Sequence, residues 1–137
     1  MLHKDAKVEL IRHVPMFAKC SKKELREIAS LADEIDFHEG KVLITEGNPG
    51  REFFVLVEGE AEVSRGGAGI DTLGPGDFFG EVALVSDAPR NATVTTTSDV
   101  LLLVVTRRDF ERLMGDVPAL QGKVMAALAD RLAPETL

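Results

Sequence analysis

From residue 78 to residue 94 the chain reads FFGEVALVSDAPRNATV, a run that combines the groups needed to hold a small anionic ligand. Gly80 lacks a Cβ, so a ligand can approach its backbone closely, and the apolar run that follows can form one or two helical turns. The N–H groups at a helix start have no partner within the helix and attract anions. Arg90 adds a fixed charge and a planar set of donors that suits phosphate oxygens.

Glu81 lies beside this anion site, where a carboxylate would repel a phosphate. Its position makes sense if it accepts hydrogen bonds from hydroxyl groups, as acidic residues do on ribose. Taken singly, Glu81 also reads as an exposed carboxylate at a helix start, and Arg90 as a surface arginine that holds a loop. The nine-residue step between them, with Gly80 and Pro89 alongside, favours a ligand in which a phosphate and a sugar hydroxyl lie close together.

The same stretch resembles the phosphate-binding cassette of cyclic nucleotide-binding domains. That family runs Phe-Gly-Glu-aliphatic-Ala-Leu, a short loop, and then Pro-Arg-x-Ala-Thr, which residues 79–84 and 89–93 match. The resemblance implies a mainly β fold with flanking helices, in which a double-stranded β-helix (jelly-roll) barrel carries N-terminal and C-terminal helices. It also implies that the backbone and Arg90 hold the cyclic phosphate while Glu81 takes the 2′-hydroxyl. The ligand-binding residues would be Phe79, Gly80, Glu81, Val82, Ala83, Arg90, Asn91 and Ala92.

The base preference depends on Asn91, where this chain departs from the family. The residue after the arginine is often alanine in cAMP-preferring members and threonine or serine in cGMP-preferring ones. Asparagine is neither, although its amide can contact a base or a phosphate. We favour cAMP as the ligand, with cGMP as the alternative, and expect no other cofactor.

The element that covers the base is also open. Family members often lay the last helix over the base, sometimes with an aromatic side chain, but this chain has no Trp or Tyr and its last aromatic residue is Phe110. The candidates for a lid are therefore Leu128, Arg131 and Leu132. The alternatives are barrel packing for the two leucines and a solvated surface position for the arginine.

The apolar pattern predicts one domain over residues 1–137, in three parts. Residues 4–32 predict two helices, 4–14 and a second that starts at a capping box, Ser21 to Glu24, and ends near Ala32. From 34 to 106, Gly and Pro interrupt short apolar runs, which predicts an all-β region that contains the cassette at 79–93. Residues 107–133 predict two more helices. The expected strands are 34–38, 41–45, 52–58, 60–65, 69–73, 92–97 and 100–106.

Composition excludes several classes of protein. A net charge of −7 argues against nucleic-acid binding, and no run of eighteen apolar residues exists that would span a membrane. The lone Cys20 and the absence of an apolar signal core at the start fit a cytoplasmic location. The three histidines, His3, His13 and His38, are not spaced as metal ligands, so we expect no metal site and no catalysis.

The leading hypothesis is a non-catalytic cyclic nucleotide receptor of the stand-alone bacterial type. Its ligand would reposition the C-terminal helices to control an effector protein in trans. The alternative is a protein-interaction module of the same fold with weak or lost nucleotide binding. A regulatory piece of a larger kinase or channel is disfavoured by the positions of Met1 and Leu137, and a gene regulator would need a DNA-binding domain.

Overall fold

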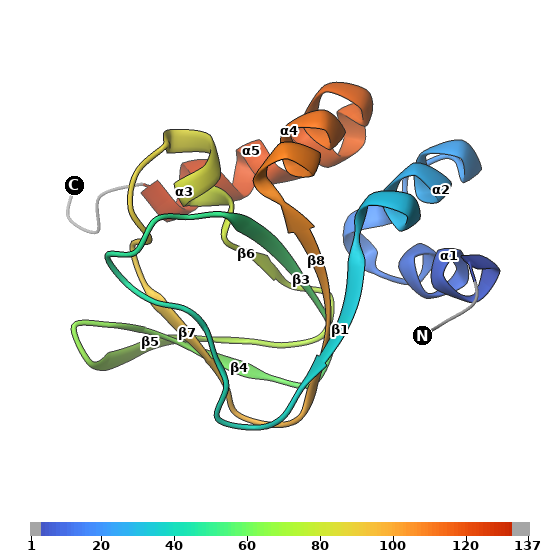
Figure 1. The fold of residues 1–137 in the computed structure, drawn as a ribbon. Coiled ribbons are helices and arrows are strands. Elements are labelled where there is room, and N and C mark those ends of the chain that lie inside the picture. Colours follow the sequence, from blue (N-terminus) through green and yellow to red (C-terminus); the bar gives the residue numbers. More distant parts are fainter. Residues whose placement is uncertain (1–3, 133–137) are drawn as a thin grey trace.

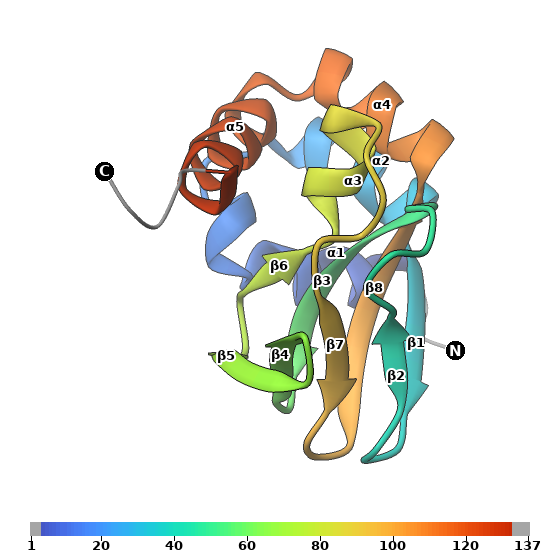
Figure 2. The same ribbon diagram turned by 90° about the vertical axis from the view of Figure 1, so that its left-hand side faces the viewer.

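A computed structural model describes the backbone of residues 4–132 and the side chains of residues 6–130. Two β-sheets face each other, and the helices gather at one end of them (Figures 1 and 2). The helices before the sheets are α1 (Lys4–Arg12), the 3₁₀ turn η1 (Pro15–Phe17) and α2 (Lys22–Leu31). The strands are β1 (Asp33–Phe37), β2 (Val42–Ile44), β3 (Glu52–Glu58), β4 (Ala61–Arg65), β5 (Ala68–Leu73), β6 (Phe78–Phe79), β7 (Thr93–Thr96) and β8 (Val100–Thr106). Helix α3 (Glu81–Ser86) lies between β6 and β7, and α4 (Arg107–Asp116) and α5 (Pro118–Leu132) follow β8.

The sheets are both antiparallel, with strand orders β1-β8-β3-β6 and β2-β7-β4-β5. This arrangement confirms the predicted mainly β, jelly-roll architecture with helices before and after the sheets in the sequence. The seven expected strands are present, β3 and β8 with the expected boundaries and the other five with boundaries shifted by one residue. The list of expected strands was incomplete, because it left out β6, which pairs with β3 through Phe79 and Phe78.

The strands β3 and β8 are apolar on both faces because each face is buried against a different layer. Phe54 of β3 and Leu102 of β8 point between the two sheets and pack with Phe79, whose ring stacks on that of Phe54 at 4.9 Å. Phe53 points the other way, into a second core formed with the helices, where its ring lies 4.9 Å from that of Phe110. This sheet therefore forms a wall that the two cores share.

The N-terminal helices follow their sequence signals closely. Ser21 accepts a hydrogen bond from the backbone N–H of Glu24, and the Glu24 side chain accepts one from the backbone of Ser21, so the predicted capping box is present. Helix α1 ends two residues earlier than expected, at Arg12, before the turn that begins at Pro15.

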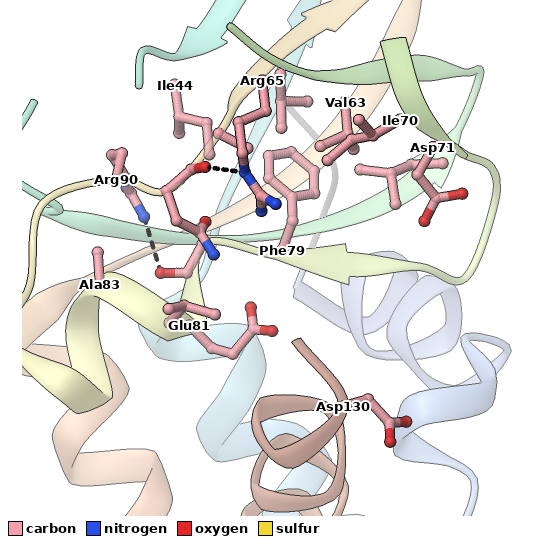
Figure 3. Close-up of a pocket in the computed structure, with 16 residues that line it drawn as sticks. Ile44, Val63, Arg65, Ile70, Asp71, Phe79, Glu81, Ala83, Arg90 and Asp130 are labelled. Carbon is pink, nitrogen blue, oxygen red and sulfur yellow. Dashed lines mark hydrogen bonds between the residues drawn. The ribbon is translucent and has the colours of Figure 1, made fainter. Parts of the chain in front are cut away.

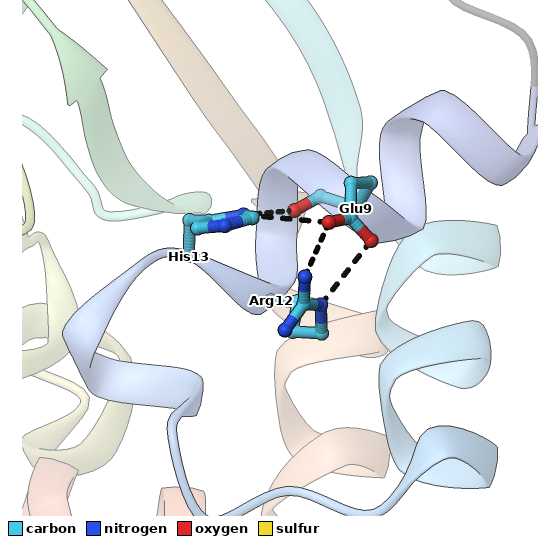
Figure 4. Close-up of polar contacts among 3 residues, drawn as sticks. All are labelled: Glu9, Arg12 and His13. Atoms are coloured by element: carbon cyan, nitrogen blue, oxygen red, sulfur yellow. Dashed lines mark hydrogen bonds and ion pairs between the residues drawn. The ribbon is translucent and has the colours of Figure 1, made fainter.

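Helix α1 carries a small polar cluster at its exposed end (Figure 4). Arg12 donates hydrogen bonds to both carboxylate oxygens of Glu9, and Nδ1 of His13 lies 2.8 Å from the Glu9 carbonyl oxygen. The hydrogen bond from Arg12 lowers the pKa of Glu9. Because these side chains face water, the cluster contributes little to stability.

The C-terminal helices cover the helix-facing side of the shared wall. Thr106 caps α4 by accepting from the N–H of Asp109, and Pro118 occupies the first turn of α5, where its missing N–H costs nothing. Leu120 and Val124 of α5 are buried, and their four-residue spacing places them on one face of the helix. Between residues 4 and 132, no helix is both long enough and apolar enough to cross a membrane.

Candidate functional site

Gly80 begins helix α3, and its conformation explains why glycine stands there. Its φ angle is 96°, in the left-handed region that residues with a Cβ rarely adopt. A Cβ at this position would also lie 2.9 Å from the carbonyl oxygen of Glu52 and 3.0 Å from Nη1 of Arg90. The glycine thus lets the chain turn sharply from β6 into α3 and lets Arg90 lie against the turn.

A pocket of about 610 Å³ opens beside this turn (Figure 3). One wall comes from the second sheet and its β4–β5 hairpin, and the other from α3 and the end of α5. The residues that line it are Ile44, Val63, Arg65, Ile70, Asp71, Leu73, Phe79, Gly80, Glu81, Val82, Ala83, Arg90, Asn91, Ala92, Val94 and Asp130. All eight ligand-binding residues expected from the sequence are among them.

Arg90 is 5% exposed and is fixed by the backbone around it. Its Nη1 donates to the carbonyl oxygen of Gly80 and its Nη2 to that of Glu52, each at 2.8 Å. Burial lowers the pKa of this guanidinium, the carboxylates of Glu52 and Glu81 raise it, and Arg107 lowers it. Both described hydrogen bonds of the side chain end on neutral carbonyl groups, so an anion in the pocket would meet a desolvated positive charge.

Glu81 is fully buried, with an exposed fraction of 0%. It occupies the first turn of α3, and Figure 3 shows its carboxylate within the pocket, on the side that faces Asp130 of α5. A buried carboxylate needs hydrogen-bond donors around it. A sugar hydroxyl supplies such a donor, so the placement is consistent with the sequence-based interpretation.

The residues expected to form a lid over the base are the part of the predicted site that the structure does not test. Leu128 is buried, at 8% exposure, and is not among the residues that line the pocket. The side chains of Arg131 and Leu132 lie outside the described residues, so the lid roles of all three stay predictions. Among the described side chains of α5, that of Asp130 lines the pocket, and the sequence did not predict this role.

Two other polar side chains in the pocket, Arg65 and Asp71, also escaped the sequence analysis. Nε of Arg65 donates to the carbonyl oxygen of Asn91 at 2.8 Å. Strand pairing explains the contact. Ser64 of β4 lies opposite Thr93 of β7, so Arg65, the next residue along β4, lies beside the end of the cassette. The sequence signal for Arg65 was weak: a charged residue at the end of a strand, just before a glycine turn.

The cassette is joined to the C-terminal helices by packing. Leu84 of α3 is buried in the core that the helices share, together with Phe110 and Leu113 of α4 and Leu120 of α5. A movement of α3 toward or away from the pocket would therefore disturb the contacts of both helices.

A polar link connects the same elements. Nη2 of Arg107, the first residue of α4, lies 3.3 Å from the carbonyl oxygens of Gly50 and Ala83, and Nη1 lies 3.3 Å from Oδ1 of Asp87. Asp87 ends α3 with φ of 55°. The start of α4 is thus tied to the end of the cassette helix.

The described residues contain no group of three or more His, Cys, Asp or Glu side chains that could hold a metal ion. The polar groups of the pocket are instead suited to an organic anion with hydroxyl groups.

Comparisons with known proteins agree with this chemistry. A family model described as the cyclic nucleotide-binding domain matches residues 34–116. The cAMP-dependent protein kinase regulatory subunit of Hypocrea atroviridis is 38% identical over 110 residues, which covers 80% of this chain and 24% of that protein. The chain spans about a quarter of the length of the curated relatives it matches first.

Solved structures give the same result. The structure of cAMP-bound PfPKA-R (141-441) matches with a TM-score of 0.77 and 26% identity, over 97% of this chain and 48% of that chain. A regulatory subunit of a cAMP-independent protein kinase A from Trypanosoma brucei matches with a TM-score of 0.78 at 21% identity, over 88% of this chain and 46% of that chain, which shows a likeness of fold alone. With the family model matched across the sheets and the cassette, the chain belongs to the cyclic nucleotide-binding domain family and is a non-catalytic regulatory domain.

Proposed function

We propose that the pocket binds cAMP and that binding repositions α4 and α5 to control an effector protein. The observation that carries this proposal is that buried Glu81 and buried Arg90 line one pocket together with Gly80. A cyclic nucleotide has a phosphate and a 2′-hydroxyl held close together by its ring, and these two side chains have the charges that such a pair requires.

In the proposed pose, the cyclic phosphate lies between Arg90 and the backbone N–H groups of residues 80–83. Glu81 accepts a hydrogen bond from the 2′-hydroxyl of the ribose. The aliphatic side chains of Val63 and Ile70 line the remaining space, into which the base extends. The choice of cAMP is supported by the cAMP named for PfPKA-R and for the kinase regulatory subunit of Hypocrea atroviridis.

The mechanism is a shift between two populations of the domain. The ligand draws α3 toward the phosphate, and Leu84 and Arg107 transmit that movement to α4 and α5. Only a ligand with different affinities for the two arrangements can shift their ratio. The relatives named as kinase regulatory subunits support an effector protein in trans, and the lone Cys20 supports a cytoplasmic location.

A thermal-shift experiment tests the proposal directly. The protein is heated with cAMP, with cGMP, and with linear 5′-AMP. The phosphate of 5′-AMP is bonded to the 5′ oxygen alone and carries more negative charge than the cyclic phosphate. Cyclic nucleotides should raise the melting temperature, since a ligand at a hundred times its dissociation constant stabilises the folded state by about 2.7 kcal/mol. No shift with either cyclic nucleotide would favour the alternative, an interaction module of the same fold that has lost its ligand.

A further inference from the structure

The charges of this chain are distributed unevenly along its sequence. Residues 33–106, which form the two sheets and α3, contain 14 Asp and Glu against 4 Lys and Arg. Residues 1–32, which contain α1 and α2, show the reverse, with 7 Lys and Arg against 4 Asp and Glu. The N-terminal helices are therefore the basic part of an acidic protein.

Four of these basic residues form one exposed surface on α2 and the turn before it. Three lie on the exposed side of α2, away from the buried Leu25 and Ile28, and one precedes the helix. Within residues 6–130, none of the four side chains forms a hydrogen bond or an ion pair, whereas Arg12, Arg107 and Arg112 each have a carboxylate partner. We call this surface the basic face, and its residues are Lys19, Lys22, Lys23 and Arg26.

The two carboxylates of α2 do not neutralise the basic face. Glu24 accepts a hydrogen bond from the backbone N–H of Ser21 at 2.8 Å, as part of the capping box. Glu27 shares a hydrogen bond with Asp116 of α4, and although Lys23 attracts Glu27, no ion pair joins these two side chains. Both carboxylates thus serve contacts that hold α2 in the fold, and the four cations face water.

The stability of α2 does not explain these positive charges. Lys22 and Lys23 are its first two residues, and the dipole of a helix disfavours cations at that end. Lys22 and Arg26 are four residues apart, a spacing at which like charges repel each other on a helix. A binding role accounts for this arrangement, because functional surfaces are where proteins break such local rules.

The size and surroundings of the basic face indicate what binds there. Helix α2 has ten residues and is about 15 Å long, a length that an extended segment of about five residues matches. A nucleic-acid duplex or an anionic bilayer presents negative charge over a much larger area, and the net charge of −7 would oppose its approach. We propose that the basic face binds an acidic segment of the effector protein, through ion pairs with Asp and Glu side chains.

This inference rests on the proposed function, because it names the chemistry of the effector. Helix α2 packs against α4, one of the helices that the proposed mechanism repositions. Figure 1 shows α2 on the opposite side of the helices from α3. An acidic segment on the basic face would therefore lie beside α4 and leave the pocket free for its ligand.

Fluorescence anisotropy with a labelled hexaglutamate peptide tests the surface, with a hexaglutamine peptide as the uncharged control. Hexaglutamate should bind the full chain, and more weakly as the NaCl concentration rises. The double variant Lys19→Glu, Lys22→Glu should weaken binding by about tenfold, since two attractions become repulsions. The matched control Lys41→Glu, Arg51→Glu changes the net charge equally at two exposed residues outside the face, and should change the affinity by less than about twofold.

Thermal denaturation separates a binding role from a structural one. Lys22→Glu should raise the melting temperature, because it places an anion at the start of α2 and opposite Arg26. A lower melting temperature would show that Lys22 serves folding, and would overturn the proposal. Equal weakening of hexaglutamate by the two double variants, or tighter binding of the wild type to duplex DNA or to phosphatidylserine vesicles, would overturn it as well.

The thermal shift with cAMP distinguishes failure of this surface from failure of the receptor. Lys19→Glu, Lys22→Glu should keep the wild-type shift, because neither residue lines the pocket. If cAMP binds the wild type and hexaglutamate does not, the docking surface fails and the receptor function stands. If hexaglutamate binds as expected and no cyclic nucleotide does, the proposed function fails and the basic face belongs to an interaction module without a ligand.

Discussion

Arg90 concentrates the expected binding energy of the site in one side chain. It is buried, and its described side-chain hydrogen bonds go to backbone carbonyl groups of β3 and of the turn at Gly80. These contacts hold the guanidinium in place before a ligand arrives, so little conformational entropy is lost on binding.

Replacing Arg90 by alanine should weaken cAMP binding roughly ten- to several-hundred-fold. A charge-assisted hydrogen bond contributes about 1.5–3 kcal/mol, and each 1.4 kcal/mol is a factor of ten in affinity. Calorimetric titration measures the loss, and Arg26→Ala serves as the control for removal of an exposed arginine. Wild-type affinity in Arg90→Ala would show that the phosphate lies elsewhere.

Gly80 and Gly122 form a matched pair for a test of the turn. Gly80→Ala should destabilise the fold by at least about 1–2 kcal/mol, because alanine is strained at a φ of 96° and its Cβ would crowd Arg90. Gly122→Ala lies within α5, where a Cβ meets nothing within 4 Å, and should stabilise the fold by about 0.5–1 kcal/mol. Chemical denaturation of both variants measures the two changes. Equal effects at the two positions would contradict the proposed reason for glycine at the turn.

At this scale the sequence predicted the residues that belong to a continuous motif. The sequence placed Glu81 and Arg90 together because both belong to one local motif, and both line the pocket, while their roles in binding stay predictions. Arg65 and Asp130 could not be predicted, because strand pairing and helix docking bring them to the pocket from distant parts of the chain. Nothing near either residue in the sequence indicates a ligand.

Helices α2 and α4 meet through a pair of carboxyl groups. Burial raises the pKa of Glu27 on α2, and a hydrogen bond with Asp116 at the end of α4 raises it further. A carboxyl group whose pKa is higher in the folded state binds protons more tightly there than in the unfolded chain. Its contribution to stability is therefore present at low pH and is lost as the pH rises from about 4.5 through the raised value.

Glu27→Gln should remove this loss and make the domain more stable at neutral pH. The amide is neutral at every pH and can donate an N–H to Asp116. Urea denaturation between pH 4 and pH 8 measures the effect, with Glu111→Gln, on the exposed face of α4, as the control for a lost negative charge. The idea fails if Glu27→Gln and Glu111→Gln change the pH profile in the same way.

The length of a strand decided whether the sequence could predict it. Strands β3 and β8 are long and rich in β-branched and aromatic residues, and both were predicted with their bounds correct. Strand β6 has two residues, too few to show any periodicity, and it pairs only because the cassette turn lies against β3. Side-chain caps mark the starts of α2 and α4, where Ser21 and Thr106 each accept a hydrogen bond from a backbone N–H of the first turn, and the cap at Ser21 was predicted.

In the whole molecule, the cassette and the C-terminal helices share one core. Saturating cAMP should therefore increase the protection of α4 and α5 in hydrogen–deuterium exchange, because in the proposed mechanism Leu84 and Arg107 pass a movement of α3 to these helices. Arg107→Ala should reduce this gain, whereas Arg108→Ala, which removes the exposed neighbour, should leave it intact. Exchange in residues 107–132 that does not respond to ligand would leave the receptor in place but exclude the switch.

The overall architecture could be predicted because Gly and Pro mark the strand ends and because the cassette motif indicates the family. The relation of the last helix to the pocket could not be predicted. Helical spacing places Leu120, Val124 and Leu128 on one apolar face, but it does not tell whether that face meets the core or a ligand. In the structure these side chains are buried, and among the described side chains of α5 it is that of Asp130 that lines the pocket.

The shared wall formed by β3 and β8 also limits how the protein can be shortened. A chain cut before residue 107 would keep the described strands and α1 to α3, yet the core that contains Phe53, Val55, Leu103 and Val105 would lose its contributions from α4 and α5. Water would then meet an aromatic and aliphatic surface on a β-sheet, the kind of surface that drives insoluble aggregates. The two sheets therefore cannot be expressed as a binding domain without the C-terminal helices. A shortened protein that is meant to keep the pocket must include α4 and α5.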